Sequence, residues 1–305
     1  MRTLTILVLL VVVPKYAAAQ SPSSRSSRDT LQFQVAQPRK VPPFPLVLNA
    51  TVRAYVDSYL AHSDALRLSY ARSAPYLTQM TEVLRQYGVP SDLVYLAFAE
   101  SSFIKSGSGP WQLTKATARR YGLQVDDYVD ERRDPIKSTR AAAEYLASLH
   151  DDIGDWRLAI VAWNTGEGML QKFVVDRGED FDRMLDHLPG RTRGLLNRFM
   201  AVAFISKNAK EYGIEDVVYT QPPPYVRISV PGGTSLERVA SATHSEVYEI
   251  QHLNPALLTD RVPPDGYEVV IPLSSRRDAQ IDWSDTASAT DPDFSRPRRH
   301  HHHLR

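Results

Sequence analysis

The sequence contains no cysteine among its 305 residues. Disulfides, thiolate metal sites, a cysteine nucleophile and a lipid-modified cysteine anchor are therefore excluded. Basic residues are not in surplus, because 36 Lys and Arg oppose 35 Asp and Glu for a formal charge of +1. Nucleic-acid binding draws on counterions released by basic residues, so this balance argues against a nucleic-acid partner. No ligand cluster with suitable spacing appears, so we expect neither a metal nor an organic cofactor.

Long apolar runs are also scarce, and the clearest one lies at the N-terminus. Residues 1–19 are typical of a secretory signal peptide, with basic Arg2, an apolar core over 4–13 and a small-residue cleavage site at Ala17-Ala-Ala19. The core is short for a membrane span. An uncleaved interfacial anchor is the alternative, and it would be the route to membrane association. Export without cysteine favours the periplasm or outer cell envelope of a bacterium.

Composition divides the rest of the chain. Residues 20–46 are rich in Ser, Arg, Gln and Pro, which predicts a disordered linker. Helical periodicity fills residues 47–218, up to a break at Pro222-Pro-Pro224. We therefore predict a mainly α protein whose larger domain is all-helical.

A different pattern follows the break. Residues 225–273 read as strand, helix, helix, strand, which predicts a small α+β (βααβ) module. Residues 274–305 are rich in Arg, Asp and Ser and are expected to form a disordered tail. The tail includes His300 to His303, which could bind a metal or be inert, and we assign them no role.

Helix starts in the larger domain are recognisable. Asn, Thr and Asp side chains accept hydrogen bonds from the first helical N–H groups, and Pro fits the first turn. We therefore expect helices to begin after Asn49, Pro90-Ser-Asp92, Thr114, Asp134-Pro135 and Asp155.

One apolar helical run, residues 92–103, carries a carboxylate near its end. Glu100 shares a helix face with Leu93, Leu96 and Ala97, and so apolar a face should point inward. A buried glutamate is costly unless it is paired or protonated, and both desolvation and the negative end of its helix favour the proton. A carboxyl that stays protonated near neutral pH suits general acid catalysis. The alternative is a frayed helix end with Glu100 in solvent.

Two motifs follow Glu100-Ser-Ser-Phe103 in order, namely Gly109-Pro-Trp-Gln112 and Ala162-Trp-Asn164 with a glycine exit. Together they resemble the lytic transglycosylases of the goose-lysozyme-like superfamily, whose pattern is Glu-Ser, Gly-x-x-Gln and Ala-Tyr-Asn. Within that family the chain is most similar to the membrane-bound murein transglycosylase D group, from about Leu77 to Gly213. The resemblance implies a lysozyme-like fold and cleavage of the β-1,4 bond between N-acetylmuramic acid and N-acetylglucosamine in peptidoglycan, leaving a 1,6-anhydro ring.

The resemblance also implies roles for particular residues. Glu100 would be the acid, and the sugar's own C6 hydroxyl would be the nucleophile, so no second carboxylate is needed. Substrate binding would fall to Ser101, Trp111, Gln112, Trp163 and Asn164.

For three of these residues a plainer interpretation stays open. Ser101 could be a helix C-terminal hydroxyl, Trp111 a core residue and Asn164 a turn residue. The chain also departs from the family pattern. Trp163 and Leu195 stand where the family has tyrosines, and Arg191 where it has an acidic residue.

The second module resembles a LysM-type glycan-binding repeat through Val230-Pro-Gly-Gly-Thr-Ser-Leu236 and Leu253-Asn-Pro255, although residues 242–247 lack the usual glycine. Since fold does not fix function, a structural cap is the alternative to glycan binding. We expect an exported lytic transglycosylase that acts on peptidoglycan strands. A catalytically degenerate peptidoglycan-binding protein and a hydrolytic muramidase of the lysozyme type are the competing hypotheses.

Overall fold

The computed structural model describes residues 41–166, 187–214 and 224–273. All of them belong to one compact unit that begins at Pro38. None of the helices in these ranges is both long and apolar enough to cross a bilayer. The residues expected to form a signal peptide, most of the expected linker, the expected C-terminal tail and most of a helix expected over 181–188 lie outside the described residues.

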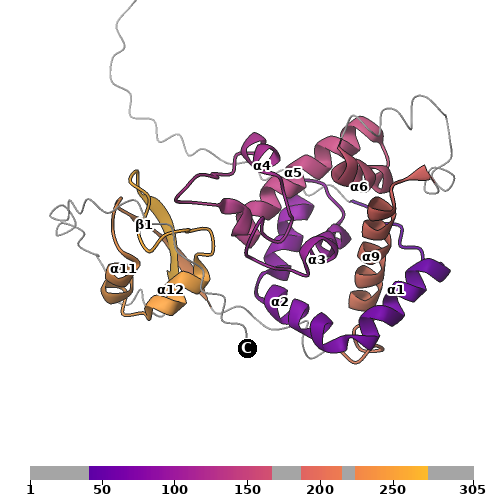
Figure 1. Ribbon diagram of the computed structural model, residues 1–305, viewed down its shortest axis with the longest axis horizontal. Helices are drawn as coiled ribbons and strands as arrows, with labels where there is room; N and C mark the ends of the chain where they lie inside the picture. The colour runs from indigo at the N-terminus through magenta and orange to yellow at the C-terminus, as the bar shows by residue number, and fades with distance from the viewer. Residues whose placement is uncertain (1–40, 167–186, 215–223, 274–305) are drawn as a thin grey trace, which may run out of the picture. The chain divides into compact units, whose positions relative to one another are not determined.

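The larger part of the unit is helical, as predicted. Its core is one cluster of buried side chains to which α1, α2, α3, α5, α6 and α9 all contribute. Helix α3 packs on α9, α5 packs on both α2 and α6, and α1 packs on α9 (Figure 1). The elements are α1 Ala50–Ala61, α2 Ser63–Gln86, η1 Ser91–Tyr95, α3 Leu96–Ser101, α4 Lys115–Arg120, η2 Glu131–Arg133, α5 Pro135–Ile153, α6 Trp156–Thr165 and α9 Gly190–Lys207.

Four of the predicted helix caps are confirmed. Asn49, Thr114, Asp134 and Asp155 each accept hydrogen bonds from backbone N–H groups of the helix that follows. The cap predicted at Pro90-Ser-Asp92 is wrong, because a 3₁₀ turn precedes α3 and no side chain caps it. The Asp92 carboxylate instead accepts bonds from the backbone N–H of Phe44 at 3.3 Å and from Lys207 Nζ at 2.9 Å.

Two predicted boundaries are also corrected. The linker ends before residue 46, since Phe44 is 3% exposed and packs edge-on against Phe199 with ring centroids 5.0 Å apart. The last long helix, expected over 195–212, starts five residues earlier and ends at Lys207.

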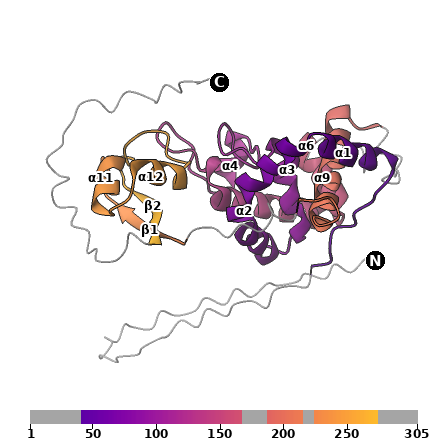
Figure 2. The same cartoon turned by 90° about the horizontal axis from the view of Figure 1, so that it is seen from below.

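The smaller part is the predicted βααβ module (Figure 2). Strand β1, Tyr225–Val230, pairs antiparallel with β2, Tyr267–Pro272, so that Val230 lies opposite Tyr267. Between them run α11, Leu236–Ala242, and α12, Val247–Leu253. The module has its own apolar cluster. At the turn that lacks glycine, His244 adopts a positive φ of 51°, which histidine tolerates better than branched residues do.

Candidate active site

Glu100 lies in the last turn of α3. The apolar stripe predicted beneath it is confirmed, because Leu93, Leu96 and Ala97 are each 0% exposed. Glu100 itself is half-buried, and the helix ends one residue later at Ser101. The carboxyl is therefore neither sealed in the core nor free in solvent.

One hydrogen bond and two positive charges act on this carboxyl. The indole N–H of Trp163 donates to Glu100 Oε1 at 2.9 Å. Burial raises the pKa of Glu100 above its usual value, although the bond from Trp163 and the charges of Arg191 and Arg198 pull the pKa down. Because burial outweighs them, the proton is held to a higher pH than on a free glutamate, as general acid catalysis requires.

Trp163 belongs to a group of aromatic rings. Its ring centroid lies 5.9 Å from that of Trp111, at an interplanar angle of 66°, and 5.3 Å from that of Tyr145. Trp111 is 1% exposed, and its N–H donates to Thr139 Oγ1 at 2.9 Å. Trp111 is thus packed in the core behind Trp163, which favours the plainer interpretation over direct contact with a substrate. Through these two rings the second and third motifs meet at Glu100.

The loop before α4 presents Gln112. This residue is exposed, has a φ of 51°, and donates from Nε2 to the carbonyl oxygen of Gly109 at 2.6 Å. Gly109 has a φ of 72°, and a Cβ there would lie 1.7 Å from the carbonyl oxygen of Arg132. Only glycine fits so close a backbone approach. The Gly-x-x-Gln spacing therefore fixes the shape of the loop as well as its outward-facing amide.

Ser101 connects this loop to the end of α3. Its hydroxyl donates to the carbonyl oxygens of Ala97 at 3.1 Å and Pro110 at 2.8 Å, and it accepts from the N–H of Ile104 at 3.2 Å. These bonds hold the end of α3 to the loop that follows it. They favour the interpretation of Ser101 as a helix C-terminal hydroxyl.

The chain turns sharply straight after Ser101. Ser102 and Phe103 both have left-handed backbones, with φ of 53° and 59°. The Phe103 ring is 0% exposed and packs between Tyr76 and Phe98. This turn could not be predicted from the sequence, because neither residue type indicates a positive φ.

Asn164 connects the end of α6 to α9. Its Oδ1 accepts a bond from the buried Thr192 hydroxyl at 2.7 Å, and α6 is capped two residues later by Gly166, whose φ is 86°. Thr192 was not predicted, since no local pattern links it to Asn164. Leu195 is a core residue at 1% exposure, whereas Arg191 is exposed and acts on Glu100 through its charge.

Three other acids of the helical part are engaged in other contacts or exposed. Glu131 pairs with Lys137 at 2.5 Å, Asp134 caps α5 and pairs with Arg227 at 3.3 Å, and Glu144 is exposed on α5. Glu167 lies outside the described residues. The charges that lower the pKa of Glu100 are those of Arg191 and Arg198.

A family model matches the segment that contains this acid. Residues 80–182 match the family model of the Transglycosylase SLT domain, a range that contains Glu100, Gln112 and Asn164. This part of the helical region is therefore similar to transglycosylase domains of this type.

Three known proteins are similar to parts of this chain. Membrane-bound lytic murein transglycosylase D of Escherichia coli (strain K12) is 28% identical over 233 residues, covering 73% of this chain and 52% of that protein. A putative tributyltin chloride resistance protein of Alteromonas sp. (strain M-1) is 37% identical over 111 residues, covering 34% of this chain and 54% of that protein. Peptidoglycan transglycosylase gp16 of Escherichia phage T7 is 44% identical over 92 residues, covering 27% and 7%. The chain thus spans about half the length of the Escherichia coli relative. Two of these relatives are named transglycosylases, as is the matching domain model.

Proposed function

We propose that this protein cleaves the β-1,4 bond between N-acetylmuramic acid and N-acetylglucosamine in peptidoglycan, with Glu100 as the single acid and base, and leaves a 1,6-anhydro product. The observation that carries the proposal is the environment of Glu100. A half-buried carboxyl with a raised pKa stands where three motifs meet, and it is held by Trp163 at 2.9 Å.

The reaction needs one proton to move twice. Glu100 gives its proton to the glycosidic oxygen as the bond between that oxygen and C1 of N-acetylmuramic acid breaks. The C6 hydroxyl oxygen of the same sugar then bonds to C1, and its proton returns to the Glu100 carboxylate. No water is added, and the tethered hydroxyl has a high effective concentration at C1.

The local charges suit the second half of this cycle. After Glu100 has lost its proton, its carboxylate is stabilised by the Trp163 N–H and by the charges of Arg191 and Arg198. Arg198 is itself fixed by donating from Nε to the carbonyl oxygen of Ala99 at 3.3 Å. If these groups outweighed burial, the pKa of Glu100 would fall and the acid would lose its proton before cleavage. The raised pKa keeps the proton in place for the first half of the reaction, and the same groups stabilise the carboxylate in the second half.

Two neighbouring functions remain as competitors. A hydrolytic muramidase would need a water activated on the opposite face of the sugar, and inverting glycosidases use a second carboxylate for that. The described charges near Glu100 are basic, which favours the anhydro route. Trp163 and Leu195 in place of the family tyrosines favour a degenerate binding protein, but the bond from Trp163 to the acid argues for a working site.

The βααβ module is proposed to bind glycan, on its LysM-like residues and its strand, helix, helix, strand order. We place the protein in the bacterial envelope, as an exported enzyme that meets its polymer there. The relative named membrane-bound fits an envelope location.

The test uses purified protein and intact sacculi, with products separated and weighed by mass spectrometry. The expected product is an anhydro-muropeptide, 18 Da lighter than its hydrolysed counterpart, a difference of about one water. Glu100→Gln should abolish release. Glu144→Gln, which changes an exposed glutamate on α5, is the matched control and should leave release intact. Hydrated products would refute the anhydro route, and an active Glu100→Gln variant would refute the assignment of the acid.

A further inference from the structure

The βααβ module touches the helical part through residues 126–134, here called the strap. The strap forms backbone bonds to the module, from the N–H of Asp130 to the carbonyl of Ala256 and from the N–H of Leu258 to the carbonyl of Tyr128, both at 2.8 Å. Val129, between them, is 0% exposed and belongs to the apolar cluster of the module. A residue of the helical part is thus buried in the core of the module.

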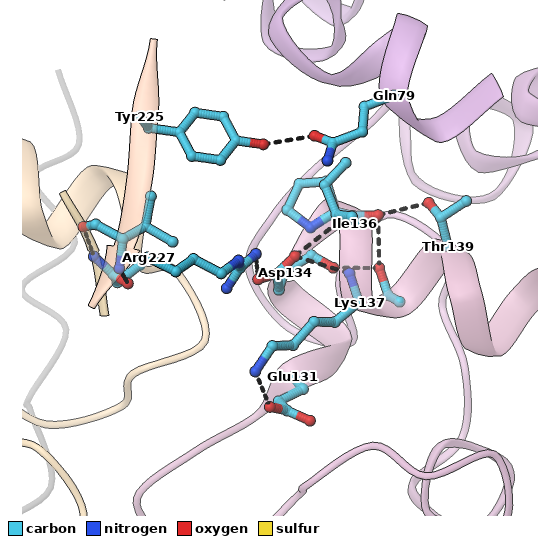
Figure 3. Close-up of polar contacts among 12 residues, drawn as sticks. Gln79, Glu131, Asp134, Ile136, Lys137, Thr139, Tyr225 and Arg227 are labelled. Atoms are coloured by element: carbon cyan, nitrogen blue, oxygen red, sulfur yellow. Dashed lines mark hydrogen bonds and ion pairs between the residues drawn. The ribbon is translucent and has the colours of Figure 1, made fainter. Parts of the chain in front are cut away.

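Side chains strengthen this junction. The Tyr267 hydroxyl donates to Glu131 Oε1 at 2.9 Å and accepts from Lys137 Nζ at 3.0 Å. Arg227 pairs with Asp134 at 3.3 Å, and Figure 3 shows this pair beside the bond between Lys137 and Glu131. Burial and the charge of Glu131 raise the pKa of Tyr267, so the phenol keeps its proton and remains a donor.

The opposite side of the strap holds the loop that carries Gln112. Arg132 Nη1 donates to Ser108 Oγ at 3.1 Å and to the carbonyl of Leu113 at 3.0 Å. Arg133 Nε donates to the carbonyl of Gly107 at 3.2 Å. The Arg132 carbonyl oxygen also lies so close to Gly109 that a Cβ on Gly109 would be only 1.7 Å from it. The loop is therefore fastened to the strap on both sides of Gln112.

Asp130 joins the two faces of the strap. Its backbone N–H donates to the carbonyl oxygen of Ala256 in the module. Its carboxylate accepts hydrogen bonds from Nε and Nη2 of Arg132, at 2.8 and 2.7 Å. Asp130 and Arg132 are 5% and 7% exposed. A paired, buried guanidinium has a fixed orientation, because releasing either partner would leave a buried charge unpaired.

We propose that the seated module positions the Gln112 loop through the strap, so that Tyr267, Asp130 and Arg132 are positioning residues for the catalytic site. The module then contributes to cleavage of glycans that are too short to reach it, and not only to holding the polymer. The kinetic consequence rests on the proposed function, whereas the mechanical coupling does not.

The experiment compares Tyr267→Phe with Tyr248→Phe in the full chain. Tyr248 is 73% exposed on α12 and provides a matched control. Hydrogen exchange is followed at the backbone amides of residues 106–113 and 254–258. Losing a bond to a charged group should raise exchange in both segments about tenfold in Tyr267→Phe, and in neither segment in Tyr248→Phe. For a soluble tetrasaccharide, KM should rise in Tyr267→Phe while the pH limits of kcat stay in place.

Asp130→Asn tests the second link, because it keeps the N–H bond to Ala256 but weakens the grip on Arg132. Exchange should rise at 106–113 and stay low at 254–258. If this variant does not fold, Arg132→Lys replaces it, since lysine keeps the charge without the guanidinium fork. Coupling is overturned if Tyr267→Phe loosens 254–258 and leaves 106–113 unchanged. A wild type that makes no anhydro product would refute the proposed function alone, and the exchange results would still decide the coupling.

Discussion

Replacing Trp163 by Phe should shift the pH dependence of cleavage to higher pH, because this change removes a hydrogen bond to the Glu100 carboxylate. The indole N–H of Trp163 bonds to Glu100 Oε1 at 2.9 Å, and a donor of this kind stabilises the ionised carboxylate. Phe keeps a ring beside Trp111 and Tyr145 but has no donor. The pKa of Glu100 should therefore rise further, and the acid should stay protonated to a higher pH.

The size of the effect follows from the strength of that bond. Hydrogen bonds to charged groups contribute about 1.5–3 kcal/mol. Glu100 is half-buried, so water replaces part of the lost bond and the lower figure applies. About 1.4 kcal/mol is a factor of ten in the ionisation constant. The alkaline limb of kcat/KM, which reports loss of the acid's proton, should thus move up by about one pH unit.

The assay measures the release of soluble anhydro product from about pH 4 to about pH 9, a range over which a carboxyl with a raised pKa loses its proton. Trp111→Phe is the control, because its N–H bonds to Thr139 and not to Glu100. That variant should lose about 1 kcal/mol of stability and keep the alkaline limb of wild type. An alkaline limb that stays put or moves down in a folded Trp163→Phe protein would refute the reasoning.

Three other substitutions have clear expectations. Glu100→Gln should stabilise the fold relative to wild type as pH rises, since a raised native pKa makes the contribution of Glu100 to stability largest below its unfolded pKa and removes it as pH rises through the native pKa; thermal unfolding at several pH values measures this, and a gap that shrinks with pH would contradict it. Gly109→Ala should cost more than about 2 kcal/mol, because a left-handed φ adds to a contact of 1.7 Å with the Arg132 carbonyl; denaturant unfolding at wild-type level would count against it. Thr192→Val should cost about 1 kcal/mol and raise KM by freeing Asn164 from its 2.7 Å bond; an unchanged KM would argue that Asn164 needs no such partner.

Much of the fold could be read from local residue patterns. Caps at Asn49, Thr114, Asp134 and Asp155, and the order of the βααβ module, depend on residues that interact within a few positions of one another. The cap expected at Asp92 failed for the opposite reason. Its partners, Phe44 and Lys207, are 48 and 115 positions away along the chain, and no local pattern reports such pairs.

The same division holds at the site. The inward stripe under Glu100 follows from helix periodicity and was predicted, but the bond from Trp163 joins residues 63 positions apart. Trp111 was expected among the substrate-binding residues, yet it is buried, because an aromatic residue next to a tight glycine turn can equally pack inward. Ser101, Gln112 and Asn164 remain predictions as substrate contacts.

The turn at Ser102 and Phe103 has a consequence for mutational scans. Phe103 combines a φ of 59° with a ring that is 0% exposed. Glycine would relax the backbone but leave the space of the ring empty, and a branched residue would fill some of that space while worsening the backbone. Almost every replacement at 103 should therefore be depleted. A scan read without the structure would mark Phe103 as a contact for the sugar, although its intolerance arises from the shape of the chain behind the acid.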